Sequence, residues 1–505
     1  MGEQTFREYL GARWGKTGDG PINDFIRRED GRLIFGDRVD LGALVAEYGA
    51  PLEVAYCPLI TQEIHRMQRV AAAARAATGY AQPLLYAYAT KANFAEEVVR
   101  TALNAGAHYE TSSAADAQIA AILWQNGTLP HDRWVFCNGS KDAEYLHAVV
   151  RLRLRGSARV VPVLDDLDEF EHFRKLSVPV RFGVRAREWA RCAGGDRFGL
   201  LEDEMLQVAE TLRDTRHELV LYHAMVGSQI EDEGEWLAAL TRAMEQYCAL
   251  WHVAPSLRMF NFGGGMPTAA YALDFVFDYE GFFRRLFTTI QTVCDRHGVP
   301  VPQVVGEFGR YTVASHSMFL FEVAQTKAGR DGAAPWYLLD GSLMVSAPDT
   351  LIVDQQFIIL PVDDWDAPAQ AVRLGGRRTC DSDDAYPRAG QEPLVLPQTE
   401  GGLVVAVFGV GAYQQMLGGR GGAHHCLNPE MRRLIIEEGP RGLEMREIAP
   451  QSLSQIMVAL GYNQQPVRQR VPVAARRRVE AVRTLGVRPA CLPASTKTPP
   501  VWVNG

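Results

Sequence analysis

The sequence lacks paired cysteines. Its eight cysteines are scattered and no two form a C-x-x-C pair, so neither a zinc site nor a disulfide framework is predicted. The neighbouring His424, His425 and Cys426 do not have the spacing of ligands for one metal site. We therefore expect no bound metal, and a reducing cytoplasm is the simplest location for the protein.

Long apolar runs and an excess of positive charge are also missing. No uninterrupted apolar run is long enough to span a bilayer, and the first residues contain no apolar core of signal-peptide length. The formal net charge of -8 gives no reason to expect nucleic acid or an anionic membrane as a partner. The balance of 47% hydrophobic and 22% charged residues is typical of a soluble globular enzyme.

What the sequence does contain is a regular alternation of strand-like and helix-like segments. Because 505 residues exceed what one hydrophobic core usually serves, two folded units are expected. Eight apolar strand-like runs alternate with helical spacing over about 250 residues, which favours a (β/α)8 TIM barrel, although a doubly wound sheet could show the same alternation. The strand-like runs are Leu84–Ala89, Ala107–Glu110, Trp134–Cys137, Ala158–Leu164, Val178–Val184, Leu219–Ala224, Met259–Phe262 and Gln303–Gly306. Helical spacing is found in Ala95–Ala105, Ala114–Trp124, Ala143–Leu154, Leu167–Lys175, Asp203–Arg213, Glu233–Ala249 and Phe282–His297.

The pattern changes after residue 315. Short β-like runs such as Met318–Gln325 and Leu403–Val410 are separated by turns rich in Gly, Pro and Asp, which indicates a mainly β C-terminal domain. We therefore expect four parts. They are an N-terminal segment (1–54) that contributes to the β domain, the barrel (55–315), the β domain (316–462) and a tail of uncertain structure (463–505).

Polar and charged residues follow the predicted barrel strands at the ends where barrel active sites lie. A lysine amine can form a Schiff base with an aldehyde, and consecutive glycines let backbone N–H groups approach a phosphate. A carboxylate can keep a pyridine nitrogen protonated, and an arginine can supply a fixed charge near a phosphate. This set predicts catalysis with pyridoxal 5'-phosphate. Its members are Lys91, Glu110, His223, Gly263, Gly264, Gly265, Glu307 and Arg310.

Several longer motifs carry a family resemblance. The stretches YAYATKAN, VGSQI, FNFGGGMP, GEFGR, TCDSDD and GAYQQML resemble, in this order, motifs of the fold-type III pyridoxal-phosphate decarboxylases. The resemblance covers roughly residues 25–435. The stretches CNGSKDAEYL, VDQQFIILPV, TCDSD and GAYQQMLGG are closer to the biosynthetic arginine decarboxylases, although the chain is shorter than typical members of that branch.

The resemblance implies the following cofactor contacts. Lys91 would carry the Schiff base, with Glu110 near it, and Glu307 would pair with the pyridine nitrogen. The family commonly has a histidine stacked on the cofactor ring where this sequence has Met225. Either the Met225 thioether packs on the ring or a local bulge brings His223 there. Ser228 would contact the phosphate or a hydroxyl group, and the phosphate would be contacted by Gly263, Gly264, Gly265, Arg310 and Tyr413.

The resemblance also implies a homodimer with shared active sites. Cys380 and Asp381 match a pair that the other subunit supplies in this family, the cysteine as proton donor and the acid as a contact of the substrate's distal group. Asp354 aligns loosely with a further acidic specificity residue. The segment DGSLMVSAPDTLIVDQ has no arginine that could grip a second carboxylate, which favours substrates ending in a cation.

We therefore expect a decarboxylase that releases CO2 from a basic amino acid resembling arginine, ornithine or lysine and leaves an amine. Diaminopimelate, or a modified amino acid of specialised metabolism, is an alternative substrate. An amino-acid racemase would use the same barrel and lysine, but its usual tyrosine base is not evident at Cys380. A catalytically silent regulator is a further alternative, against which the retention of Lys91, Glu307, Cys380 and Tyr413 argues.

Overall fold

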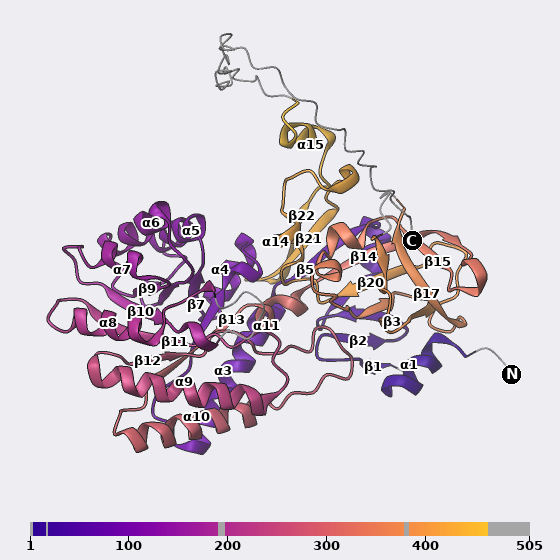
Figure 1. The fold of residues 1–505 in the computed structure, drawn as a ribbon. Helices are drawn as coiled ribbons and strands as arrows, with labels where there is room; N and C mark the ends of the chain where they lie inside the picture. The colour runs from indigo at the N-terminus through magenta and orange to yellow at the C-terminus, as the bar shows by residue number, and fades with distance from the viewer. Residues whose placement is uncertain (1–3, 17–18, 190–196, 378–382, 463–505) are drawn as a thin grey trace, which may run out of the picture. The chain divides into compact units, whose positions relative to one another are not determined.

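The computed structural model describes residues 4–16, 19–189, 197–377 and 383–462 (Figure 1). Eight parallel strands close into a barrel in the order β10-β11-β12-β13-β6-β7-β8-β9, which confirms the predicted (β/α)8 fold. Their bounds are β6 (Leu85–Ala89), β7 (His108–Thr111), β8 (Val135–Cys137), β9 (Val160–Leu164), β10 (Arg181–Arg185), β11 (Glu218–His223), β12 (Met259–Asn261) and β13 (Gln303–Phe308).

Helices connect these strands and cover the outside of the barrel. Many of them begin at an Asp or Ser whose side chain accepts a hydrogen bond from the backbone three residues on, as Ser113 does from Asp116 and Asp142 does from Tyr145. The helices are α3 (Pro58–Thr78), α4 (Glu96–Asn104), α5 (Ala114–Gln125), α6 (Ala143–Leu154), α7 (Leu167–Phe173), α8 (Glu202–Leu212), α9 (Glu233–Val253) and α10 (Tyr279–His297). None of the helices in the described ranges is both long and apolar enough to cross a membrane.

The barrel interior is a packed core rather than a channel. Side chains from alternating strand positions fill it, among them Phe136, Val163, Leu221 and Val305. Gly183 in β10 has no side chain because the space is taken: a Cβ there would lie 2.9 Å from Leu221 Cδ2 and 3.1 Å from Val163 Cγ2. Within the barrel, a cavity can therefore form only at the ends of the strands.

A ten-stranded sheet forms the second core. Strand β14 (Ser317–Lys327) pairs antiparallel with β5 (Leu52–Tyr56), so the chain before the barrel and the chain after it share one sheet. The other strands are β15 (Trp336–Leu339), β16 (Ile359–Pro361), β17 (Ala369–Gly376), β18 (Ala385–Tyr386), β19 (Leu394–Pro397), β20 (Val404–Phe408), β21 (Arg432–Gly439) and β22 (Gly442–Ile448).

Short elements complete the described chain. A small antiparallel sheet precedes β5, made of β1 (Gly20–Pro21), β2 (Ile26–Glu29), β3 (Arg32–Phe35) and β4 (Val39–Asp40). The remaining helices are α1 (Phe6–Trp14), α2 (Leu41–Tyr48), α11 (Arg310–Val313), α12 (Leu343–Ser346), α13 (Asp349–Ile352), α14 (Gln414–Gly418) and α15 (Leu453–Ala459). The expected tail at 463–505 lies outside the described residues.

The packed barrel interior gives a testable expectation. Gly183→Val should lower the free energy of unfolding by about 1–3 kcal/mol, because the new side chain must displace Leu221 and Val163 from a filled core. Urea unfolding followed by fluorescence measures the change. Gly422→Ala is the matched control, since no atom lies within 4 Å of a Cβ at Gly422. Equal stability of the two variants would contradict a filled interior at this layer.

Candidate active site

One cavity at the carboxyl ends of the barrel strands collects most of the predicted site residues. Lys91 enters it from the 3₁₀ turn Thr90–Ala92 that follows β6, and Glu307 enters from β13. Its volume is about 150 Å³. The lining residues are Ala89, Lys91, Met225, Ser228, Gly264, Gly265, Met266, Glu307, Phe308, Gly309, Arg310, Tyr311 and Tyr413.

Glu307 is held by two buried amides. Its Oε1 accepts hydrogen bonds from Asn138 Nδ2 at 2.9 Å and from Asn261 Nδ2 at 2.7 Å. Burial raises the pKa of Glu307, but His223, the two amides and Lys91 outweigh this effect, and the pKa lies below its usual value. Burial lowers the pKa of His223 to about 4, so its ring is neutral near pH 7. With His223 neutral, the two amides and the Lys91 cation are the groups that favour the ionised form of Glu307 at that pH.

Glu110 is a second buried carboxylate beside the first. Its Oε1 accepts from the same Asn138 Nδ2 at 2.8 Å, and its Oε2 has no hydrogen-bond partner. Burial and the charge of Glu307 raise the pKa of Glu110 to about 8. Ionising both of two buried carboxyl groups that share one amide nitrogen costs much electrostatic free energy. Near neutral pH, Glu307 is therefore ionised and Glu110 holds a proton.

Lys91 is exposed to solvent at the cavity although protein surrounds it closely, because the cavity opens outward at this point. This crowding lowers the pKa of Lys91, but Glu110, Tyr413 and Glu307 raise it more, so the net pKa lies above the usual value. Without a covalent partner the amine is thus a cation facing two carboxyl groups. An aldehyde that bound this amine would meet both groups.

The glycine loop after β12 forms a cradle beside the lysine. Gly263 has a φ of 73° and Gly265 a φ of 112°, conformations that residues with a side chain rarely adopt. A Cβ at Gly263 would lie 2.6 Å from Met225 Sδ and 3.2 Å from His223 Nε2. The Gly264 N–H donates to Met225 Sδ at 3.3 Å. The thioether of Met225 therefore covers the loop and lines the cavity.

His223 lies behind Met225 rather than on the open cavity. Its side chain is buried, and neither ring nitrogen makes a hydrogen bond within the described structure. Its Nε2 is 3.7 Å from Glu307 Oε2, beyond hydrogen-bond distance. The structure thus brings both residues to the site and assigns the cavity wall to Met225.

Arg310 and Tyr413 lie together on the opposite wall. The guanidinium carbon of Arg310 is 4.6 Å from the centre of the Tyr413 ring. The Tyr413 N–H donates to the carbonyl of Ala92 at 2.7 Å, next to Lys91. The Gln414 N–H donates to the Ala412 carbonyl at 2.9 Å and closes a γ-turn in which Tyr413 has a φ of 68°. This strained turn fixes a β-domain tyrosine against the lysine turn of the barrel.

Behind this wall, polar residues of the barrel and of the β domain hold Arg310. Its Nη1 donates to Tyr271 Oη at 3.1 Å and to Asp349 Oδ2 at 3.4 Å. Asp349 and Gln414 in turn form a reciprocal pair. The Asp349 N–H donates to Gln414 Oε1 at 3.1 Å, and Gln414 Nε2 donates to Asp349 Oδ2 at 2.9 Å. The guanidinium is therefore oriented from behind and keeps donors for an anion in the cavity.

Of the predicted residues in the described part of the chain, Asp354 lies away from the cavity. Asp354 is largely exposed and its carboxylate is 3.9 Å from Arg388 Nε, outside the cavity wall. Cys380 and Asp381 lie outside the described residues.

The predicted site lacks five residues that build it. Asn138 was noted at a strand end but was given no role, and Asn261 also stands at a strand end, so position was the signal that could have found both. No such signal marks Asp349, Gln414 or Tyr271. Each of them contacts a residue that lies far away along the chain.

The residues present fit a phosphorylated pyridine aldehyde. The cavity offers an amine, an ionised carboxylate held by amides, an arginine with an unpartnered Nε and a glycine loop that a Cβ would fill. Among the described residues, no group of three or more His, Cys, Asp or Glu side chains is placed to hold a metal ion.

The titration of Glu110 gives a pH prediction. Its folded pKa of about 8 lies above the ordinary 4.5, so the folded chain binds the extra proton. The stability contributed by neutral Glu110 is complete below pH 4.5 and is lost as the pH rises through about 8. The free energy of unfolding of the cofactor-free chain should therefore fall between about pH 4.5 and 8, by at most about 1.4 kcal/mol per pH unit from this group.

Glu110→Gln should remove the part of the pH dependence of stability that Glu110 contributes. Thermal unfolding midpoints at the two ends of this pH range measure the change. The exposed Glu400→Gln is the matched control and should retain the slope of the unchanged chain. A Glu110→Gln slope equal to that of the control would show that Glu110 is ionised across this range.

Known proteins resemble this chain in sequence and fold. Residues 65–314 match the family described as pyridoxal-dependent decarboxylase, pyridoxal binding domain. Biosynthetic arginine decarboxylases of Salmonella dublin and Salmonella typhi are each 28% identical over 326 residues. The match covers 57% of this chain and 49% and 47% of those relatives, so the chain spans about half the length of the curated relatives it matches.

Solved structures share the fold. A biosynthetic arginine decarboxylase from Campylobacter jejuni has a TM-score of 0.77 at 19% identity, over 90% of this chain and 92% of that one. A diaminopimelate decarboxylase from M. jannaschii in complex with L-lysine has a TM-score of 0.72 at 19% identity, over 88% and 99% of the two chains. A lysine/ornithine decarboxylase from Vibrio vulnificus complexed with putrescine has a TM-score of 0.56 at 24% identity, over 74% and 92%.

Proposed function

We propose, from the premise that this chain belongs to the fold-type III family of pyridoxal-dependent decarboxylases, that it releases CO2 from a basic amino acid and leaves an amine. The observation that carries the proposal is the convergence of Lys91, Glu307 and the glycine loop on one cavity of a (β/α)8 barrel. Pyridoxal 5'-phosphate is the cofactor that this set of groups would hold.

Each residue has a distinct task in the proposal. The amine of Lys91 would bind the cofactor aldehyde, and Arg310 would bind the phosphate beside the glycine loop, whose missing side chains leave room for it. Glu307, ionised because Asn138 and Asn261 donate to it, keeps a proton on the pyridine nitrogen. With that nitrogen protonated, the cofactor supplies an acceptor for the electron pair released when the carboxylate leaves.

A basic substrate is favoured by the similarity to arginine decarboxylases and by the absence of an arginine from residues 340–355. A substrate with a second carboxylate would find no arginine partner in that segment. We propose a homodimer in which one subunit completes the site of the other with Cys380, as proton donor to the α-carbon, and Asp381, as a contact of the distal cation. Asp354, exposed in the single chain, is a further candidate for that contact.

A cytoplasmic location is part of the proposal. Eight cysteines without C-x-x-C pairing suit a reducing compartment, and Cys57, Cys137, Cys248 and Cys294 are buried free thiols.

The decisive experiment measures CO2 release by the purified chain with pyridoxal 5'-phosphate over a panel of L- and D-amino acids. Release should be greatest with arginine, lysine or ornithine, and Lys91→Ala should reduce it to the rate of the free cofactor, because the amine that binds the aldehyde is gone. The visible absorbance of the bound cofactor should disappear with it. The exposed Lys175→Ala is the matched control and should keep both signals.

Other outcomes identify the alternatives. Exchange of the α-proton without CO2 release would identify a racemase. Absence of cofactor absorbance in the unchanged chain would identify a silent relative. Retained absorbance in Lys91→Ala would refute the assignment of the lysine.

A further inference from the structure

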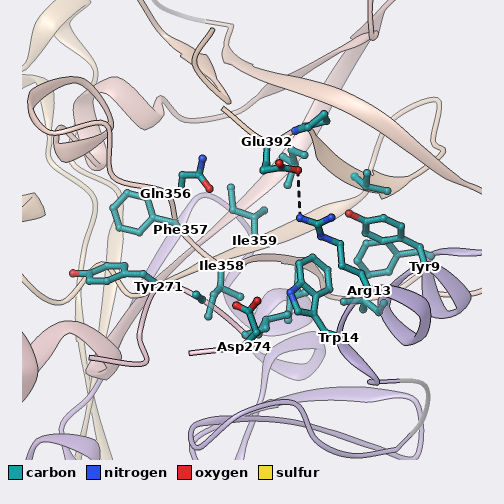
Figure 2. Close-up of a pocket in the computed structure, with 18 of the residues that line it drawn as sticks. Tyr9, Arg13, Trp14, Tyr271, Asp274, Gln356, Phe357, Ile358, Ile359 and Glu392 are labelled. Atoms are coloured by element: carbon teal, nitrogen blue, oxygen red, sulfur yellow. Dashed lines mark hydrogen bonds and ion pairs between the residues drawn. The ribbon is translucent and has the colours of Figure 1, made fainter. Parts of the chain in front are cut away.

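A second cavity lies in the β domain, apart from the barrel mouth. Its volume is about 220 Å³ (Figure 2). Helix α1 forms one side with Tyr9, Arg13 and Trp14. The other walls are residues 271–274, which continue the glycine loop of the catalytic cavity, and the segments 356–360 and 392–395. The proposed decarboxylation has no use for this cavity.

Its lining combines an apolar body with acidic ends. Phe357, Ile358 and Ile359 are buried and form an apolar wall, and the Tyr9 and Trp14 rings meet edge to face at 5.8 Å. Figure 2 shows the carboxylates of Glu392 and Asp274 at opposite sides of the cavity, with Ile358 and Ile359 between them in this view.

Cations fit this lining better than anions. Arg13 is the sole lysine or arginine among the lining residues and already pairs with Glu392 at 3.3 Å, whereas Asp274 adds a second carboxylate. The Arg13–Glu392 pair is exposed, with 48% and 72% of the two side chains accessible, so an incoming ammonium can compete for Glu392 at little cost. The aromatic rings add attraction for a positive charge. An alkyl chain with an ammonium at each end matches the apolar wall and both carboxylates.

The cavity is also connected to the catalytic site by two segments. Tyr271 lines it and packs edge to face on Phe357 at 5.8 Å, while its hydroxyl accepts the hydrogen bond from Arg310. The wall segment 356–360 follows closely after Asp349, the other partner of Arg310. The two side chains that hold Arg310, Tyr271 of the barrel and Asp349 of the β domain, therefore belong to segments that run on into the second cavity.

We propose that this cavity binds an aliphatic diamine and that its occupation weakens cofactor and substrate binding at the barrel. The inference rests on the proposed function, since decarboxylation of a basic amino acid yields an amine of this class. An ammonium at Asp274 and an alkyl chain against Phe357 would shift the segments that carry Tyr271 and Asp349. Because both side chains hold Arg310, its position would change as well. Reciprocity requires that bound cofactor weakens diamine binding by the same factor.

The first test measures binding without activity. Calorimetry with 1,4-diaminobutane is performed on the full chain carrying Lys91→Ala, which cannot turn over substrate. Adding Asp274→Asn and Glu392→Gln should weaken binding about tenfold, because both charge-assisted contacts are lost. Asp364→Asn with Glu400→Gln is the matched control: it makes the same charge change at exposed β-domain residues outside the cavity and should leave the affinity unchanged.

The second test uses the chain with Lys91 intact. The diamine should raise the dissociation constant of pyridoxal 5'-phosphate, read from its absorbance, in the unchanged chain and in the Asp364→Asn/Glu400→Gln control. This effect should vanish in Asp274→Asn/Glu392→Gln, whose cofactor affinity without diamine should equal that of the control.

The outcomes separate this inference from the proposed function. Equal diamine affinity in the two double variants would overturn the second site, whatever amino acids the chain decarboxylates. Diamine binding at Asp274 and Glu392 in a chain that binds cofactor but releases no CO2 would support the site and refute the decarboxylase.

Discussion

The amide of Asn138 imposes the constraint on which the catalytic cavity depends. Its single nitrogen donates to both Glu110 and Glu307, so two buried carboxyl groups are held side by side. Their charges cannot coexist there without a large electrostatic cost, and the second amide, from Asn261, favours ionisation of Glu307 over that of Glu110. The same asymmetry supplies an ionised acid at β13 for a pyridine nitrogen and a neutral acid at β7 near the lysine.

The catalytic cavity also depends on contacts between the barrel and the β domain. Lys91 belongs to the barrel, but Tyr413, which is fixed beside it, belongs to a loop of the β domain. A tyrosine at a φ of 68° is costly unless its surroundings impose it. Here the Ala92 carbonyl and the buried Gln414–Asp349 pair impose it, so the cavity is complete only when both domains are folded together.

Local sequence signals were sufficient for the barrel and for part of its strand ends. The strand-like runs follow from the period of apolar residues, whereas Lys91 was predicted from its position at a strand end together with the resemblance of YAYATKAN to a family motif. The 21-residue helix α3 was missed because its buried face is made partly of Ala71 and Ala74, which leave little contrast with the alanines around them. The Gln414–Asp349 pair was missed for another reason: 65 residues separate its partners, and the motif GAYQQML, which contains Gln414, does not indicate its contact with Asp349. The position of Asp354 relative to the cavity could not be predicted from the sequence, because its exposure depends on the turn that carries it.

The placement of Arg310 suggests why a site built this way would be open to control. An arginine at a helix start needs no partner from another domain, yet this one contacts Asp349 of the β domain besides Tyr271 of its own barrel. Each partner removes freedom from the guanidinium, and Asp349 also makes its position depend on the β domain. Because Tyr271 lines the second cavity and residues 356–360 of its wall follow closely after Asp349, a ligand in that cavity would change the free energy that orients Arg310. Precise orientation and sensitivity to a distant ligand thus arise from the same two contacts.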